Sequence, residues 1–301
     1  MRYAIVEKGE IVEARVLLEG VVPAGAIVEA RLKQVGTPAI ADADGSEYLL
    51  PKGAPGVSQG SLLVIEVTRE AIPGAESWKR PLAKVADGPP REARVAGEMI
   101  AFPAPSDLLE EAGWNELIEE ARTGRVDFDG GSLGIFVTPA MTLIDVDGQL
   151  APPELAVAGA AAAAQAIRRL DIGGSIGIDL PTVAGKAPRL AAAEAIDAIL
   201  PQPFERTAMN GFGFLQIVRP RRRASLLELA QDRLAFEARA LLRQAAFDGS
   251  GARRLVGHPA VIAVLGAKPE WTDALARQLG GAISLRADAS IPIHGAYAEK
   301  A

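Results

Sequence analysis

The chain has 301 residues, enough for one large domain or two to three small ones, and 49% of them are hydrophobic, so a sizeable core can form. The absence of cysteine excludes disulfides, cysteine-ligated zinc and a cysteine nucleophile, and it is typical of a reducing compartment. A net charge of −6 argues against a protein that coats nucleic acid by bulk electrostatics, although residues 201–254 hold ten arginines and five acidic residues.

The first part of the chain is predicted to be rich in β-strands. Two apolar runs around Lys8-Gly9-Glu10 predict a β-hairpin over residues 1–24, and short strands between Gly and Pro turns over residues 25–86 indicate a small β-barrel or sheet. The charged N-terminus lacks the apolar segment of a secretory signal. The alanine-rich run over residues 155–166 is shorter than the roughly 20 apolar residues that span a bilayer. We therefore expect a cytoplasmic protein without a membrane partner.

The middle of the chain is predicted to hold a βαβ crossover. Residues 106–123 first form one amphipathic helix, N-capped by Ser106 and ended by Gly124. The runs LGIFV and MTLIDVD then predict an antiparallel hairpin. An alanine-rich helix from Pro153 to Gly173-Gly174 leads into the strand SIGIDL. Two helices, a strand and a compact α/β unit are predicted further on, over residues 188–200, 225–247, 212–219 and 253–301.

Three aspartates of the crossover are candidate metal ligands. Because a crossover makes its strands parallel, Asp145 and Asp179 lie at the same sheet edge, about 5 Å apart if the strands are neighbours. Asp147 shares a face with Asp145, since strand side chains alternate. Carboxylates without cysteine or histidine nearby favour Mg²⁺ or Mn²⁺ over zinc. Alternatively, each aspartate only caps a turn or a helix, and the spacing alone leaves both interpretations open.

Three sequence blocks resemble the catalytic region of the ribonuclease E/G family. They are GGSLGIFVTPAMTLIDVDG (130–148), AIRRLDIGGSIGIDLPTV (166–183) and MNGFGFLQIVRPRR (209–222), in the family's order. The resemblance implies an α/β (α+β) fold in which an RNase H/DNase I-like catalytic core carries a small S1/OB-like β insertion and a small C-terminal α/β domain. The implied segments are a hairpin packed on the core, the S1/OB-like domain, the nuclease core and the small domain, at residues 1–24, 25–86, 87–250 and 251–301.

The same resemblance implies roles for individual residues. Asp145 and Asp179 match the family's two catalytic, metal-binding aspartates, and Asp147 stands where the family usually has an asparagine. The stretch from Tyr48 to Pro51 looks like the RNA-binding block of the S1 domain. Candidates for guiding or stacking on the RNA in this part are Tyr48, Trp78, Lys79 and Arg80, with a place for the aromatic residues in the barrel core as the alternative.

The chain also departs from the family. The loop between Asp145 and Asp179 is shorter than in the family's large members, and the segment that reads a 5′-monophosphate and the CPxC zinc link are both missing. Gly211 stands where the family has an arginine. The resemblance therefore supports the chemistry better than the regulation or the assembly of the family, and the sequence does not specify an oligomeric state.

Basic residues outside the barrel are further candidates for phosphate contacts. The run 219–223 leaves a strand and enters a helix, and guanidinium groups match phosphate oxygens. Two more basic residues follow the strand of Asp179 and are placed to clamp the scissile phosphate. A solvated turn without a ligand is the alternative for both groups. The candidates are Arg219, Arg221, Arg222, Arg223, Lys186 and Arg189.

These observations predict a Mg²⁺-dependent endoribonuclease that hydrolyses phosphodiester bonds in single-stranded RNA, with Asp145 and Asp179 holding Mg²⁺ or Mn²⁺. We expect no zinc, because cysteine is absent and the two histidines, His258 and His294, lie far apart in the sequence. Two rival hypotheses remain open. One is a non-catalytic RNA-binding protein of the same fold, and the other is a phosphodiesterase that acts on small nucleotides.

Overall fold

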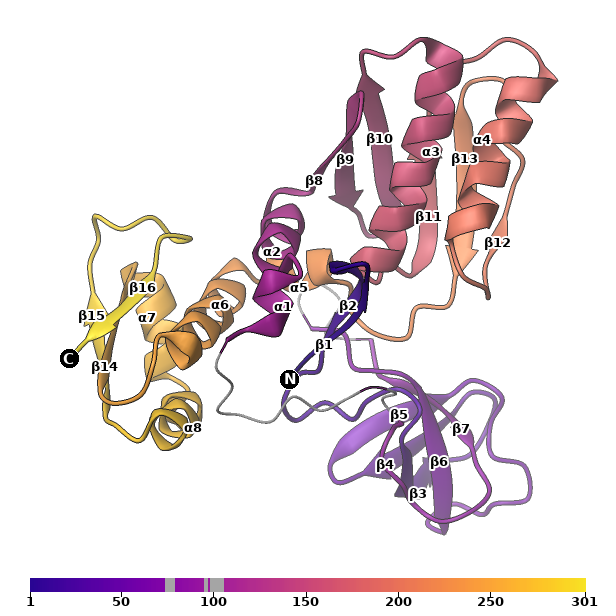
Figure 1. The fold of residues 1–301 in the computed structure, drawn as a ribbon. Coiled ribbons are helices and arrows are strands. Elements are labelled where there is room, and N and C mark those ends of the chain that lie inside the picture. Colours follow the sequence, from indigo (N-terminus) through magenta and orange to yellow (C-terminus); the bar gives the residue numbers. More distant parts are fainter. Residues whose placement is uncertain (74–78, 95–96, 98–105) are drawn as a thin grey trace. The chain divides into compact units, whose positions relative to one another are not determined.

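The computed structural model describes residues 1–73, 79–94, 97 and 106–301, which form a mixed α/β protein with several sheets and a small five-stranded barrel (Figure 1). The chain divides into two compact units. The first comprises residues 1–96 and 112–228, and the second comprises residues 97–111 and 229–301. Within the described residues, none of the helices has the length and apolar character that crossing a bilayer requires.

The first unit begins with the predicted hairpin. Strands β1 (Arg2–Glu7) and β2 (Glu10–Val16) pair antiparallel around Lys8 and Gly9. Both turn residues have positive φ angles, 55° and 87°, which is the backbone conformation that a tight two-residue hairpin requires. The hairpin therefore forms where the turn residues predict it.

A closed barrel follows the hairpin in the chain. Its strands pair in the order β3-β4-β5-β7-β6, all antiparallel except β5 with β7. Alternate side chains point inward, and Leu32, Leu50 and Ile65 are fully buried in its core. The strands are β3 (Ile27–Gln34), β4 (Ala39–Ala43), β5 (Ser46–Leu50), β6 (Leu62–Arg69) and β7 (Leu82–Val85).

The first unit also contains a six-stranded sheet with the order β12-β13-β11-β10-β9-β8. The predicted crossover is confirmed, because β10 and β11 are parallel neighbours joined through helix α3 (Pro152–Arg169). The remaining pairs are antiparallel. The strands are β8 (Arg125–Phe128), β9 (Gly131–Val137), β10 (Thr142–Gly148), β11 (Gly174–Asp179), β12 (Glu205–Arg206) and β13 (Phe214–Arg219).

Helices α3 and α4 (Lys186–Ile199) cover one face of this sheet (Figure 1). Alanine and glycine in α3 allow close approach, and a Cβ atom on Gly159 would lie 2.3 Å from Val146 of β10. The buried Ile144 shares this covered face by strand alternation. The side chains in the opposite phase point away from the helices. We call that side the open face, and its residues include Phe136, Leu143, Asp145, Asp147, Asp179, Phe214 and Val218.

The single helix predicted over residues 106–123 is wrong. The segment forms two helices, α1 (Leu108–Glu111) and α2 (Trp114–Thr123), because Gly113 between them adopts a left-handed conformation with φ 98°. The carboxylate of Asp107, rather than Ser106, accepts the first backbone N–H groups of α1. Gly124 ends α2 as predicted, with φ 69°.

The long helix predicted over residues 225–247 is also interrupted. Helix α5 (Leu226–Gln231) stops before Asp232, and α6 (Arg233–Phe247) begins after it. Asp232 accepts a hydrogen bond from the backbone N–H of Ala235 (3.3 Å), so it acts as the N-cap of α6. An aspartate that competes for backbone N–H groups restarts the helix despite continuous helical periodicity on both sides.

The second unit has its own apolar core, in which α6 and the predicted C-terminal α/β segment pack together. Buried core residues include Leu241, Leu255 and Leu265. Strand β14 lies at the centre of a three-stranded sheet, parallel to β15 and antiparallel to β16. The elements after α6 are β14 (Arg253–Gly257), α7 (Pro259–Gly266), α8 (Pro269–Leu279), β15 (Ile283–Ala287) and β16 (Tyr297–Lys300).

Candidate active site

Asp145 and Asp179 lie side by side on the open face. They are register partners in the parallel strands β10 and β11, and Asp179 is the last residue of its strand. Neighbouring strands are about 4.8 Å apart, so two exposed carboxylates in this register can approach a common ion by rotating their side chains. The backbone thus brings together two residues that are 34 positions apart in the sequence.

Asp147 lies on the same face, further along β10, where it pairs with Ser132 of β9. The pKa of Asp145 is raised chiefly by partial burial, and further by the negative charges of Asp147 and Asp179. Holding Asp145 ionised therefore costs free energy, and a cation beside it would offset that cost.

The donor set fits a hard divalent cation. Asp145, Asp147 and Asp179 offer only carboxylate oxygens, the ligands that Mg²⁺ and Mn²⁺ prefer. In the described part of the chain, no three His, Cys, Asp or Glu side chains already converge closely enough to hold an ion. The register of β10 and β11 places Asp145 beside Asp179, and Asp147 lies two residues further along β10.

Aromatic residues of the open face are the part of this site that sequence reasoning missed. Phe214 pairs with Asp179, and Gly134, the partner of Asp145, lies two residues before Phe136 on β9. Phe136 is 58% exposed. The available signal was strand phase, because Phe136 and Leu143 alternate with buried residues and therefore share the face of the carboxylates.

Lys186 and Arg189 lie at the start of α4, after the strand of Asp179. Lys186 is exposed, and its side chain has no ion pair or hydrogen bond among the described residues. Arg189 donates through Nε to the carbonyl of Gly185 (2.8 Å), and its guanidinium lies 3.7 Å from the position that a Cβ atom on Gly211 would take. Arg189 thus places its positive charge beside Gly211, which has no side chain of its own.

The arginine run at 219–223 is largely used within the protein. Arg219 donates to the carbonyl of Ile172 (3.1 Å), and its pKa is lowered chiefly by burial. Arg221 is paired with Glu228. In the part of the chain that the structure describes, the exposed side chain of Arg222 alone has no partner within this run. Three of the four arginines in this run are therefore engaged in internal interactions.

Arg223 belongs to a buried ion-pair cluster. Its guanidinium contacts Asp171 (2.8 Å) and Glu70 (3.2 Å), and the backbone N–H of Glu70 donates to the carbonyl of Arg222 (2.8 Å). Asp171, with a positive φ of 53°, ends the turn after α3, before the glycines predicted to stop that helix. These contacts link the residue that follows β6 of the barrel to the turn after α3 and to the segment after β13, so the cluster has a structural role.

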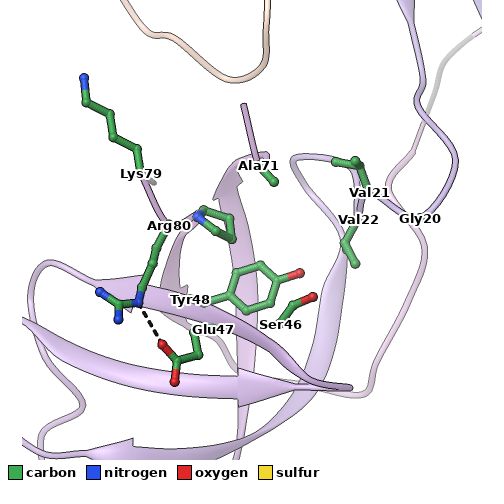
Figure 2. A pocket seen from close by; sticks show the side chains of 10 residues that line it. Gly20, Val21, Val22, Ser46, Glu47, Tyr48, Ala71, Lys79 and Arg80 are labelled. Carbon is green, nitrogen blue, oxygen red and sulfur yellow. Dashed lines mark hydrogen bonds and ion pairs between the residues drawn. The ribbon is translucent and has the colours of Figure 1, made fainter. Parts of the chain in front are cut away.

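The three described barrel candidates, Tyr48, Lys79 and Arg80, line one pocket of about 250 Å³ (Figure 2). Tyr48 is only 3% exposed, so it belongs mainly to the core, and its pKa is raised chiefly by burial and then by Asp44. Arg80 is paired with Glu47 across 2.9 Å. Trp78 lies outside the described residues. The pocket brings Tyr48 together with Lys79 and Arg80, which follow it by 31 and 32 positions in the sequence.

Comparison of the sequence with protein-family models gives no match, and comparison with curated proteins gives none either. The likeness to ribonuclease E/G therefore rests on the three sequence blocks. Those blocks supply β9 and β10, the end of α3 with β11, and β13, which together form the centre of the open face.

Proposed function

We propose that this chain is a Mg²⁺-dependent endoribonuclease that hydrolyses single-stranded RNA, related to the ribonuclease E/G family. The observation that carries the proposal is the pairing of Asp145 with Asp179 in parallel register on an open sheet face. The pKa of Asp145 is raised chiefly by burial and further by the charges of Asp147 and Asp179, so keeping this residue ionised is costly for folding, which favours a functional role over a structural one. The cysteine-free sequence suits a cytoplasmic enzyme.

Asp145 and Asp179 would hold the cation, with Asp147 adding negative charge at the rim of the site. Mg²⁺ or Mn²⁺, when bound, supplies activation of water and stabilisation of charge on the phosphate. The protein contributes the fixed spacing of β10 and β11, which holds both carboxylates on one side of the substrate. The donor set includes no nitrogen or sulfur ligand, so the proposal includes no zinc.

The barrel is proposed to be the S1/OB-like RNA-binding part. Its strand order, with the third and fifth strands parallel, is that of five-stranded OB barrels, and such barrels bind oligonucleotides on their second and third strands and adjoining loops. The pocket at Tyr48, Lys79 and Arg80 lies on the third strand, β5, and on the segment before β7. The six-stranded sheet with α3 and α4 is proposed to be the RNase H/DNase I-like nuclease core.

Product analysis with end-labelled single-stranded RNA tests the function. Cleavage is expected with Mg²⁺ or Mn²⁺, with 5′-phosphate and 3′-hydroxyl ends, and chelation by EDTA should stop it. Binding without cleavage would identify a non-catalytic RNA-binding protein. Hydrolysis of dinucleotides or cyclic nucleotides, with RNA left intact, would identify a phosphodiesterase for small nucleotides.

A thermal unfolding titration tests the metal site without measuring activity. Mg²⁺ should raise the Tm of the wild-type chain, because a ligand that binds only the folded state stabilises it. The variant Asp179→Asn should lose this response. Asp127→Asn, which removes an exposed carboxylate from the edge strand β8, is the matched control and should keep it. An unchanged response in Asp179→Asn would place the cation elsewhere.

A further inference from the structure

The open face carries two aromatic rings that lie over glycines. Phe214 leans from β13 across to β11, where its Cζ atom lies 2.5 Å from the position that a Cβ atom on Gly177 would take. The side chain of Leu143 approaches the same point to 3.0 Å. Only a glycine leaves room for this arrangement, so the ring rests against the sheet rather than standing away from it.

Phe136 is arranged in the same way on the other side of the carboxylates. Its Cε2 and Cζ atoms lie 3.1 and 3.3 Å from the position of a Cβ atom on Gly134, and the Cβ atom of Asp145 lies 3.9 Å from that position. The ring therefore leans back along its own strand toward the aspartate. Most of the ring is nevertheless exposed, since Phe136 is 58% accessible to solvent.

The two rings flank the carboxylate pair across the sheet. Asp145 and Asp179 belong to the central strands β10 and β11, while the rings come from β9 on one side and β13 on the other. With strands about 4.8 Å apart and a register offset of two residues, the glycines under the rings, on β9 and β11, are separated by roughly 12 Å. This distance suits two consecutive nucleotides, one on either side of a phosphate.

We infer that Phe136 and Phe214 are stacking platforms for the two bases that flank the scissile phosphate of single-stranded RNA. The inference rests on the proposed nuclease function and adds a base-binding element to its site. Aromatic rings stack on any base, so such platforms hold RNA without reading its sequence. Phosphate contacts from arginine are less available, because most of the run 219–223 is engaged internally.

Charge argues for a nucleotide rather than a second protein copy as the occupant of this surface. A second copy that docked through this same face would bring its own carboxylates against Asp145, Asp147 and Asp179, and unpaired buried carboxylates are costly. A nucleotide brings a phosphate and its cation to the carboxylates and bases to the rings. The apolar and acidic parts of the open face are then satisfied together.

The test is an affinity measurement on short single-stranded RNAs in Ca²⁺, which slows hydrolysis, with an abasic site moved along the strand. Phe136→Leu and Phe214→Leu keep an apolar cover over the glycines but remove the ring, and each should weaken binding about five- to hundredfold. Phe136→Trp and Phe214→Trp should retain wild-type affinity. Val218→Ala, a 53% exposed residue of the same face, is the control and should bind normally.

The abasic scan separates stacking from a structural effect. One abasic position should weaken binding to the wild-type chain and have no further effect on Phe136→Leu, and a second position should behave in the same way with Phe214→Leu. Full additivity of the abasic site and the leucine substitution would overturn the inference. So would a concentration-dependent dimer that the leucine variants dissociate, because the face would then be an interface between copies.

The inference and the proposed function fail in different ways. Wild-type RNA affinity in both leucine variants, together with metal-dependent cleavage, would overturn the platforms and leave the nuclease intact. Ring-dependent RNA binding without cleavage under any divalent metal would support base stacking at these positions and overturn the nuclease.

Discussion

The two faces of the six-stranded sheet are made by the same strands, but one face is buried under helices and the other is exposed to solvent. On the covered face, Ile144 and Val146 are buried under the alanine-rich helix α3. On the open face, Leu143, Asp145 and Asp147 occupy the intervening positions and are exposed. Because side chains alternate along a strand, one short segment supplies core packing on one side and candidate chemistry on the other.

The energetic contrast between the faces indicates which residues are present for function. Each isoleucine buried on the covered face stabilises the fold by about 1.5–3 kcal/mol. The open face lowers the stability of the fold, because Asp145 has a raised pKa and large apolar side chains remain exposed to water. Features that cost stability persist more readily where they bind or react with something, and that reasoning directs the functional proposal to the open face.

The largest expected effect is the loss of RNA cleavage when an aspartate of the open face is replaced. Asp145→Asn and Asp179→Asn should each reduce RNA cleavage at least about hundredfold, because each removes a charge that holds the cation. Their unfolding profiles should remain near that of the wild type. Steady-state cleavage rates and thermal melts measure the two quantities, with Asp127→Asn on the edge strand as the control. More than about a tenth of wild-type activity in either variant would show that its aspartate is not an essential ligand.

A substitution on the covered face should produce the opposite outcome. Ile178→Ala, at a fully buried position that pairs with Ile144, should destabilise the fold by about 2–5 kcal/mol through lost transfer energy and a residual cavity. Metal-dependent cleavage per folded molecule should change much less. Urea unfolding measures the free energy, and Val218→Ala on the open face is the comparison at an exposed position. Equal losses of stability in both variants would contradict the division of roles between the faces.

The closest packing on the covered face should also be measurable. Gly159→Ala places a methyl group against Val146 and should destabilise the fold by about 1–3 kcal/mol through overpacking. The double variant Gly159→Ala with Val146→Ala creates space for that methyl group and should be less destabilised than the sum of its single variants. A double-mutant cycle from unfolding data gives the coupling between the two positions. Strict additivity would mean that this helix–strand contact does not limit packing.

The smallest expected effect concerns pH and the open face. The folded-state pKa of Asp145 lies above its ordinary value of 3.8, so ionising this residue costs more in the folded than in the unfolded chain. Its contribution to stability is full below that ordinary value and is lost as pH rises through the raised folded-state pKa. Without divalent cations, Asp145→Asn should therefore be slightly more stable than wild type at pH 7, by less than about 1 kcal/mol.

Unfolding free energies measured from pH 7 downward test this expectation. The advantage of Asp145→Asn should shrink as the pH falls toward 3.8 and disappear below it, since wild-type Asp145 is then neutral in both states. Mg²⁺ at pH 7 should also remove the advantage, because it stabilises only the wild-type pair. A variant that is less stable than wild type at pH 7 would indicate that Asp145 has a favourable structural partner.

Sequence reasoning succeeded where local signals agreed. The turn at Lys8-Gly9 predicted the hairpin, and the proline, alanine and arginine pattern around α3 predicted the crossover that makes Asp145 and Asp179 neighbours. It failed where one residue overrode a longer pattern. Gly113 and Asp232 each divide a helix whose apolar periodicity continues on both sides, because a left-handed glycine and a capping carboxylate end the hydrogen-bond ladder locally.

The sequence by itself determined the strand–helix–strand order and the placement of Asp145 and Asp179 on neighbouring parallel strands, because turn chemistry, helix caps and the handedness of crossovers are local rules. Only the tertiary structure decided which polar groups remain available. Arg219, Arg221 and Arg223 look like free cations along the chain, yet carbonyls and carboxylates distant in sequence engage them. Likewise, Phe136 and Phe214 become neighbours of the carboxylates only through strand register, which is set by long-range pairing and not by local propensity.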